Sequence, residues 1–351
     1  MDTLTHALSG ALIARATAPK AGTPDTLPLA RRIGIGFLAA AFPDLDFVTS
    51  FISPLSYLYH HRGVTHSLIV LPAWGLLLAL LCALIWRKGP RWRAYFGVIA
   101  WGIGIHIAGD VITSFGTMIF APFTDARYGI STTFIIDLWF TGIILAGLLA
   151  ALAWRGSRVP AIAGLAVLAG YVSLQYALQQ RAVDFGAAYA AAAGFKQPSV
   201  TAQPRPVSAF NWMVIVSEGD AYHYSLVNLW RDEPVRLAPD AGLVARLSAP
   251  YLPVAQAVWN RAPRYGTGPG EIRLARDAWA QPQLAFFRWF AQYPVLYKVE
   301  AGNPELCVWF HDLRFFTPGR ATWPFRYGLC RETAGEWMPF QLVGGLRLPV
   351  Y

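Results

Sequence analysis

Residues 59–72 read YHHRGVTHSLIVLP, and this stretch places three histidines and an arginine directly before a long apolar run. The run continues to Trp86 without a charged residue. A helix of about 20 apolar residues crosses the roughly 30 Å hydrocarbon core of a bilayer. The sequence therefore predicts a membrane helix with ligand-forming side chains at its entrance.

The composition divides the chain into two parts. Hydrophobic residues make up 55% of the chain and charged residues only 14%, whereas soluble domains carry about 25% charged residues. No glutamate precedes Glu218, and charged residues become frequent after Arg181. We expect a membrane-embedded domain over residues 1–180, a helix exit and linker over 181–206, and a small soluble domain over 207–351.

The first part contains six apolar segments, which predict a membrane α-helical bundle of about four long and two short helices. The six segments are Leu4–Ala18, Ile33–Val48, His66–Trp86, Tyr95–Thr113, Thr133–Trp154 and Val159–Leu178. The first two are short for a full span, so they are expected to be tilted or to form a re-entrant hairpin.

Basic residues indicate the orientation of these segments. If the segments alternate across the membrane, ten of the twelve Lys and Arg residues before residue 178 fall in connections on one side. The positive-inside rule assigns that side to the cytoplasm. Both ends and the C-terminal domain are then expected outside. The net charge of +9 largely reflects this topology and the scattered bases of the second half, so no nucleic-acid partner is predicted.

Histidines and aspartates gather at the outer ends of the predicted segments. In HIAGD, residues 106–110, a His and an Asp four residues apart share one helix face. His and Asp are ligands of zinc and other divalent first-row metals. The candidate metal ligands are His6, Asp44, Asp46, His61, His66, His106, Asp110 and Asp137. The expected metal is a divalent ion, zinc. Because eight candidate ligands exceed the needs of one tetrahedral ion, we favour a centre with two ions.

Such a centre favours hydrolysis by a metal-activated water. Asp44 or Asp46 is the expected general base, since the membrane half has no glutamate. Arg62 and Arg127 lie on the outer side, and a guanidinium pairs well with phosphate oxygens. We therefore expect a phosphoester or lipid-like substrate. The alternatives are an ion- or proton-coupled transporter that uses the His/Asp cluster, or activity located in the soluble domain.

Other polar residues have a plainer interpretation. His60 is a weaker ligand candidate, Asp125 is expected to be a loop residue, and His223 and His311 are expected to be structural. Cys307 and Cys330 could form a disulfide if the second half is exported.

The order of the motifs resembles a known family. His6, PDLD at 43–46, HRGVTHS at 61–67 and HIAGDVIT at 106–113 are similar to the LexA-regulated, membrane-bound metal-dependent hydrolases of bacteria, over about residues 1–140. The resemblance implies a location in the bacterial inner membrane. It also implies a metal site made from His6, Asp44, Asp46, His61, His66, His106 and Asp110. FIIDLWF, with Asp137, is similar to a pattern in some members.

The second part is predicted to be a small α+β domain with an antiparallel sheet. QPSVTAQPRP, residues 197–206, is typical of a linker. Segments rich in β-branched and aromatic residues follow it and predict strands. Two helices are expected over Leu243–Asn260 and Ile272–Ala291.

Overall fold

The computed structural model describes residues 1–19, 26–87, 90–302, 305–320, 323–332 and 335–350. The chain divides into two compact units. The first unit comprises Met1–Thr49 and Tyr59–Ala177, and the second comprises Ser50–Leu58 and Leu178–Tyr351. Two of the twelve basic residues on which the predicted orientation rests, Lys20 and Lys88, lie outside the described residues.

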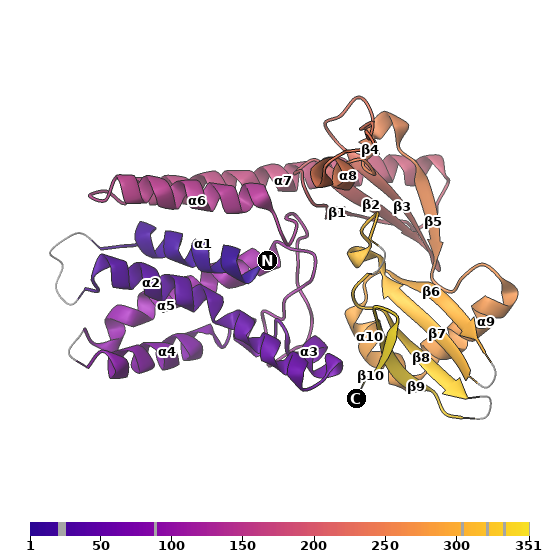
Figure 1. The fold of residues 1–351 in the computed structure, drawn as a ribbon, viewed down its shortest axis with the longest axis horizontal. Coiled ribbons are helices and arrows are strands. Elements are labelled where there is room, and N and C mark those ends of the chain that lie inside the picture. Colours follow the sequence, from indigo (N-terminus) through magenta and orange to yellow (C-terminus); the bar gives the residue numbers. More distant parts are fainter. Residues whose placement is uncertain (20–25, 88–89, 303–304, 321–322, 333–334, 351) are drawn as a thin grey trace. The chain divides into compact units, whose positions relative to one another are not determined.

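The N-terminal part of the chain is helical (Figure 1). Its elements are α1 (Thr3–Ala16), α2 (Leu29–Ala41), η1 (Pro43–Phe51), α3 (Pro54–His60), η2 (Val64–His66), α4 (Leu71–Ile85), α5 (Trp92–Val111), α6 (Leu138–Ala153) and α7 (Val159–Ala192), where η denotes a 3₁₀ helix. The boundary between the two units falls inside α7.

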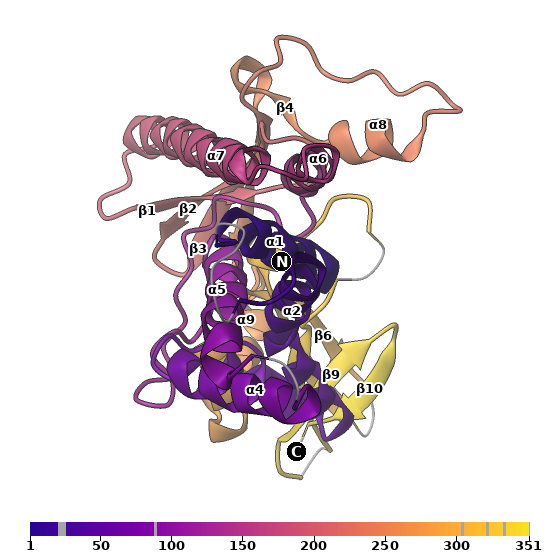
Figure 2. The ribbon, with the colours of Figure 1, turned by 90° about the vertical axis from the view of Figure 1, so that its left-hand side faces the viewer.

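Helix α1 is central to the first unit, since it contacts α2, α5 and α6 (Figures 1 and 2). One apolar core joins α2, α4 and α5 around Ile35, Ala79 and Ile103. A second core joins α1, α6 and the first part of α7 around Leu12 and Ile144. The first core includes Ile103 and Ile107 of α5, which lie before and after His106 in the sequence.

Small residues allow α1 and α2 to approach closely. A Cβ atom added to Gly10 would lie 2.2 Å from the carbonyl oxygen of Gly36. Small residues at helix crossings are typical of membrane bundles, where packing rather than the hydrophobic effect drives association. The α1–α2 pair positions the segment that follows α2, which includes Asp44.

Among the described residues, two helices, α5 and α7, are long and apolar enough to cross a membrane, and the count rises to four if each of two bent pairs forms one span. The bent pairs are α2 with η1, at 41°, and Pro54–His66 with α4, at 77°. Helix α6 is apolar but shorter. The third predicted segment was expected to begin at His66, but α4 begins at Leu71. Pro72 explains the difference, because proline fits the first turn of a helix but not its interior.

The second unit contains a first sheet of five strands (Figure 1). Its strands are β1 (Ser199–Pro204), β2 (Asn211–Glu218), β3 (Ala221–Asn228), β4 (Leu252–Pro253) and β5 (Trp259–Pro263). All pairs are antiparallel except β3 with β4. The last part of α7 packs on this sheet, and a Cβ atom at Gly186 would lie 2.6 Å from Val200 and Val214.

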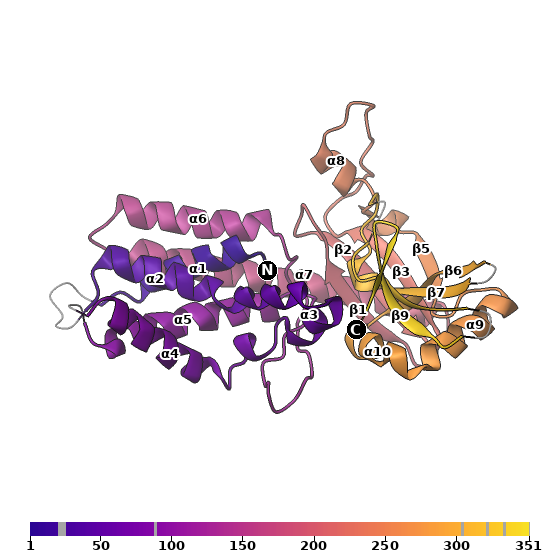
Figure 3. The same cartoon turned by 60° about the horizontal axis from the view of Figure 1, so that its bottom comes forward.

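A second five-stranded antiparallel sheet has the order β10-β9-β8-β7-β6 (Figure 1). Figure 3 shows β6, β7 and β9 of this sheet from another side. Its strands are β6 (Pro294–Ala301), β7 (Glu305–Asp312), β8 (Tyr327–Glu332), β9 (Met338–Val343) and β10 (Leu346–Pro349). Cys307 and Cys330 face each other in the β7–β8 ladder and form a disulfide. The remaining elements of the unit are α8 (Leu243–Ser248), η3 (Val254–Gln256), α9 (Pro269–Ala280), η4 (Pro282–Leu284), α10 (Ala285–Phe290) and η5 (Leu313–Phe315).

The second unit differs from the expectation in several respects. It has two sheets rather than one, and β1 lies within the segment expected to be a linker. Pro204, the last residue of β1, is tolerated because β1 is an edge strand. The helix expected over Leu243–Asn260 ends at Ser248, because Pro250 and Pro253 prevent its continuation. The helix expected over Ile272–Ala291 is divided near Pro282 into α9 and α10.

Candidate metal centre

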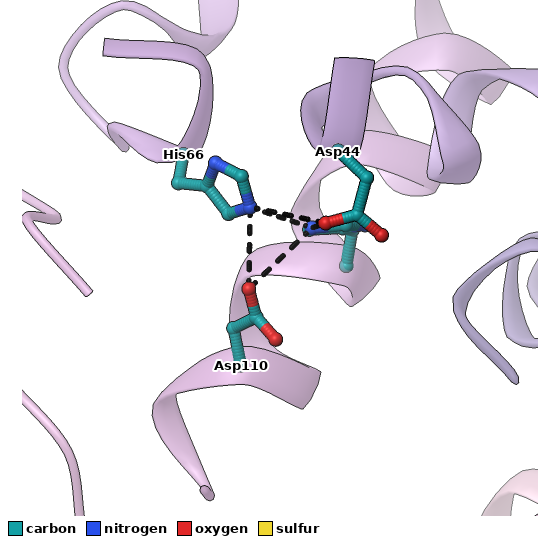
Figure 4. A group of neighbouring side chains, drawn as sticks. Asp44, His66 and Asp110 are labelled. Carbon is teal, nitrogen blue, oxygen red and sulfur yellow. Dashed lines mark hydrogen bonds and ion pairs between the residues drawn. The ribbon is translucent and has the colours of Figure 1, made fainter. Parts of the chain in front are cut away.

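Four of the predicted ligands converge in the first unit. The ligand atoms of Asp44, His66, His106 and Asp110 all lie within 4.8 Å of one another. They come from η1, η2 and α5, three elements that are far apart in the sequence. Figure 4 shows the side chains of Asp44, His66 and Asp110 pointing toward one another. We call these four residues the tetrad.

The distances within the tetrad are compatible with one shared ion. His66 Nε2 lies 2.9 Å from His106 Nε2 and 3.2 Å from Asp110 Oδ2. His106 Nε2 lies 3.6 Å from the same Asp110 oxygen, and Asp44 Oδ1 lies 3.8 Å and 3.7 Å from the two imidazole nitrogens. Two nitrogens and two carboxylate oxygens thus surround one point.

Burial makes this arrangement costly without a cation. His66, His106 and Asp110 are fully buried, and the side chain of Asp44 is 13% exposed. Asp110 Oδ2 has no hydrogen-bond donor among the described residues. A buried carboxylate oxygen normally has a partner, because desolvation without one is unfavourable. A divalent cation held by the tetrad would satisfy this oxygen, so the donor set fits a metal.

The Nδ1 atoms of both tetrad imidazoles, which point away from the centre of the tetrad, contact polar groups of the protein. His106 Nδ1 lies 2.6 Å from the Ala40 carbonyl oxygen, which can only accept a hydrogen bond. His66 Nδ1 lies 3.2 Å from Asp46 Oδ2 and 3.0 Å from the Thr65 hydroxyl. A neutral imidazole that donates from Nδ1 presents a lone pair at Nε2. Both Nε2 lone pairs therefore face the centre of the tetrad, as in histidine ligands supported by a carboxylate or carbonyl group.

Asp46 accepts hydrogen bonds from several groups behind His66. Its Oδ2 accepts from the Arg62 backbone N–H and the Thr65 hydroxyl, both at 2.9 Å, and its Oδ1 lies 2.7 Å from His61 Nδ1. The backbone at Arg62 has φ of 60°, in the left-handed region, which turns this N–H toward Asp46. The structure thus places Asp46 and His61 around the tetrad rather than within it.

The second oxygen of Asp110 is held by cations and His6. Asp110 Oδ1 contacts the α-amino group of Met1, and it lies 3.0 Å from His6 Nε2 and 2.8 Å from Arg62 Nη2. The His6 ring stacks on His106 with centroids 3.7 Å apart. His6 therefore orients two members of the tetrad from one side.

Comparison with known proteins identifies a family for residues 1–182 of the chain. The model of the YdjM inner membrane protein family matches residues 1–182, which include every residue of the site. The chain belongs to the YdjM inner membrane protein family. This is the LexA-regulated family whose motifs the sequence resembles. The YdjM-family part is thus the helical part of the chain.

One relative and the solved structures complete the comparison. YfhP of Bacillus subtilis (strain 168), itself described as an uncharacterized protein, is 26% identical over 187 residues, which are 52% of this chain and 55% of that protein. The chain thus matches about half the length of that relative. No solved structure matches the chain.

The two arginines predicted to bind phosphate, Arg62 and Arg127, contact the protein itself. The Arg62 side chain is 2% exposed, and its Nη1 donates to the Thr113 hydroxyl at 2.9 Å. Arg127 donates to the carbonyl oxygens of Gly116, at 3.3 Å, and His61, at 3.2 Å. Both guanidinium groups also lie over the Phe115 ring, at 5.0 and 5.2 Å. In the structure these contacts support the loops around the tetrad.

Asp137 is not brought to the tetrad. It is the N-cap of α6, where its Oδ1 accepts from the backbone N–H groups of Trp139 and Phe140 at 2.9 and 3.0 Å. Tyr171 and Gln175 of α7 donate to its Oδ2 at 3.0 and 2.9 Å. Its position before an apolar helix is typical of a cap, and this signal competes with the ligand interpretation in the sequence.

The structure also adds residues that the sequence analysis did not single out. The Thr3 hydroxyl donates to Asp44 Oδ2 at 2.6 Å, and the Ala40 carbonyl accepts from His106. Thr3 lies three residues before His6, so both belong to one face of α1 and the helix period could have indicated it. A backbone carbonyl such as that of Ala40 leaves no signal in the sequence.

Proposed function

We propose that this YdjM-family protein is a metal-dependent hydrolase of the membrane surface. The observation that carries the proposal is the tetrad, in which two imidazole lone pairs and two carboxylates converge in a buried space. Two nitrogen and two oxygen ligands suit zinc, with other first-row divalent ions as competitors.

One ion is better supported than the two expected from the sequence. Among the residues that the structure describes, the tetrad is the one group of His and Asp side chains compact enough to hold an ion. Asp46 and His61, which a second ion would need, bond to each other at 2.7 Å. We therefore assign one ion to the tetrad and a supporting role to this pair.

Asp44 is the member of the tetrad that is most exposed to solvent. Its side chain is the only partly exposed member of the tetrad, and Thr3 holds its Oδ2. A bound divalent ion would lower the pKa of a coordinated water toward neutrality. Asp44 is suited to orient that water and to accept its proton, because one of its oxygens faces the tetrad while the other faces Thr3.

A groove beside the site supports a lipid-like substrate. A hollow of about 460 Å³ has Asp46 and Thr65 on its wall, together with apolar side chains such as Trp74. A second hollow of about 320 Å³, lined by apolar residues of α2, α4 and α5, shares Phe42 and Leu45 with the first. The two hollows thus combine a polar end with an apolar end, which matches an ester that carries an acyl chain. The phosphoester class rests on Arg62 and Arg127 and receives less support from their contacts.

Charge and redox chemistry support the proposed orientation. Basic residues in the connections between α4 and α5 and between α6 and α7 favour a cytoplasmic location for those ends. The site then lies on the outer face of the inner membrane. The Cys307–Cys330 disulfide supports a periplasmic or extracellular C-terminal domain, because disulfides persist in oxidising compartments.

The test uses the full chain purified in detergent. Metal content is measured by mass spectrometry, and hydrolysis is followed with a para-nitrophenyl acyl ester and with bis(para-nitrophenyl) phosphate. We expect about one ion per chain, activity that a chelator abolishes and zinc restores, and loss of both in His66→Ala and Asp110→Ala. Asp125→Asn is the matched control for metal content, since Asp125 lies outside the tetrad. Unchanged metal content in both tetrad variants would refute the metal site. Bound metal without hydrolysis of either probe would count against the enzyme.

A further inference from the structure

A further pocket, lined by two arginines and several aromatic and apolar residues, lies in the C-terminal unit. It has a volume of about 300 Å³ and lies between the segment before β8 and strand β9. Its lining includes Arg320, Trp323, Phe325, Arg326, Gln341 and Leu342. Two of the lining residues are arginines, and no lining residue is acidic.

Arg326 is a buried cation without an anionic partner. Its residue is 3% exposed, and among the described residues it forms no ion pair. Its Nη1 donates to the Tyr297 hydroxyl at 3.2 Å, and its guanidinium lies over the Tyr297 ring at 5.2 Å. Its Nε has no hydrogen-bond partner among the described residues. Buried charges are normally paired, because desolvation is unfavourable.

The contrast with Arg314 in the same unit shows what Arg326 lacks. Arg314 is also buried, but its Nε donates to Asp312 Oδ2 at 2.8 Å and its Nη2 to the Phe290 carbonyl oxygen at 2.6 Å. Arg314 thus has a carboxylate partner within the protein, whereas Arg326 lines a cavity and has no such partner among the described residues.

A second donor accompanies Arg326. The indole Nε1 of Trp323 is buried and has no acceptor among the described residues. The ring is fixed by neighbouring aromatic side chains, with centroids 4.7 Å from His311 and 5.1 Å from Phe316. Indole N–H groups usually find an acceptor when they are buried. Two unsatisfied donors thus occur in the wall of one cavity.

The backbone between these two donors is strained. Phe325 has φ of 57°, a conformation that costs a bulky residue free energy and often marks a functional site. The segment is held in place because the Leu342 N–H donates to the Arg326 carbonyl oxygen at 2.9 Å. Trp323 and Arg326 flank Pro324 and the strained Phe325, and all four residues line the pocket.

From these features we infer that the pocket binds an oxyanion, a phosphate or carboxylate group, attached to an apolar or aromatic body. Arg326, Arg320 and the Trp323 N–H hold the oxygens, and Phe325 and Leu342 contact the apolar part. Charge-assisted bonds from a guanidinium to such a group are strong and directional. The same group can come from a soluble molecule or from a lipid headgroup.

The experiment is isothermal titration of the full chain with phenyl phosphate. We expect one site per chain, and Arg326→Gln and Arg320→Gln should each weaken it about tenfold or more. Trp323→Phe retains the ring but removes the donor, and should weaken binding about two- to tenfold. Arg273→Gln, at an exposed position on α9, removes the same charge and should leave binding unchanged.

The source of the anion is distinguished in a second arm. The chain is placed in nanodiscs of phosphatidylcholine alone or with phosphatidylglycerol, and titrated again. Weaker phenyl phosphate binding in the anionic nanodiscs would identify a lipid headgroup, and equal binding would identify a soluble ligand. If Arg326→Gln does not fold, the affinities of Arg320→Gln and Trp323→Phe for phenyl phosphate still test the inference. Wild-type affinity in these two variants, or an equal loss in Arg273→Gln, would overturn the inference.

Discussion

Asp46 provides the sharpest test of the metal centre, because its position separates a ligand from a residue that supports a ligand. The structure places its Oδ2 3.2 Å from His66 Nδ1, on the side of the ring away from the tetrad. The substitution Asp46→Asn keeps the size of the side chain and removes the charge. It also replaces one carboxylate oxygen, which accepts hydrogen bonds, by an amide NH₂ group, which donates them. The groups around this side chain, such as the Arg62 backbone N–H and the Thr65 hydroxyl, are donors themselves.

The expected magnitude follows from this role. Loss of a carboxylate that supports a metal-bound histidine lowers metal affinity about 10- to 100-fold, or about 1.4–2.7 kcal/mol. The number of ions bound at saturation should not change, because the four atoms of the tetrad remain. Asp110→Asn should reduce affinity far more, since Asp110 Oδ2 itself faces the tetrad.

The measurement is a zinc titration against a competing chelator, with the purified chain in detergent. Asp125→Asn is the matched control, because Asp125 lines the same groove as Asp46 and is exposed. A dissociation constant within threefold of the wild type would show that Asp46 does not support His66. Loss of the ion at saturation, as in Asp110→Asn, would show that Asp46 is a ligand, and the assignment of roles would be wrong.

Three further predictions concern stability and the role of Asp137. Gly10→Ala should lower the free energy of unfolding by about 1–3 kcal/mol, because its Cβ would lie 2.2 Å from the Gly36 carbonyl oxygen; thermal melts in detergent measure this, with Gly34→Ala, whose Cβ meets no atom within 4 Å, as control. Asp137→Ala should cost about 1–3 kcal/mol through the lost N-cap and the lost hydrogen bonds from Tyr171 and Gln175 and leave the metal content unchanged, so a variant that loses its ion in mass spectrometry would refute this structural role. Burial lowers the pKa of His311 from 6.5 to about 4; the unfolded chain therefore binds the extra proton between these values, and stability falls as the pH drops from about 6.5 toward 4, by up to about 3 kcal/mol. Denaturant melts of His311→Gln should lack this component, and a difference from the wild type that is constant with pH would contradict it.

Much of the membrane part could be predicted from the sequence. The scarcity of charge before Arg181 and the length of the apolar segments indicate membrane helices, since both reflect transfer free energies that act locally. The HIAGD motif likewise predicts that His106 and Asp110 share a face, because the helix period alone sets this. The sheets were less predictable: β1 lies in a proline-containing segment, and its pairing with β2 depends on contacts outside it.

By itself the sequence determined which side chains are available and roughly where along each segment they occur. The tertiary structure decided which of the eight candidate ligands face one another. The left-handed backbone at Arg62 turns an N–H toward Asp46 and thereby keeps this carboxylate behind His66, while the first turn of α6 engages Asp137 as its cap. Both outcomes follow from unpaired backbone N–H groups, which compete with a metal for the same oxygens. The direction of those groups depends on how distant segments pack, and it leaves no pattern in the sequence.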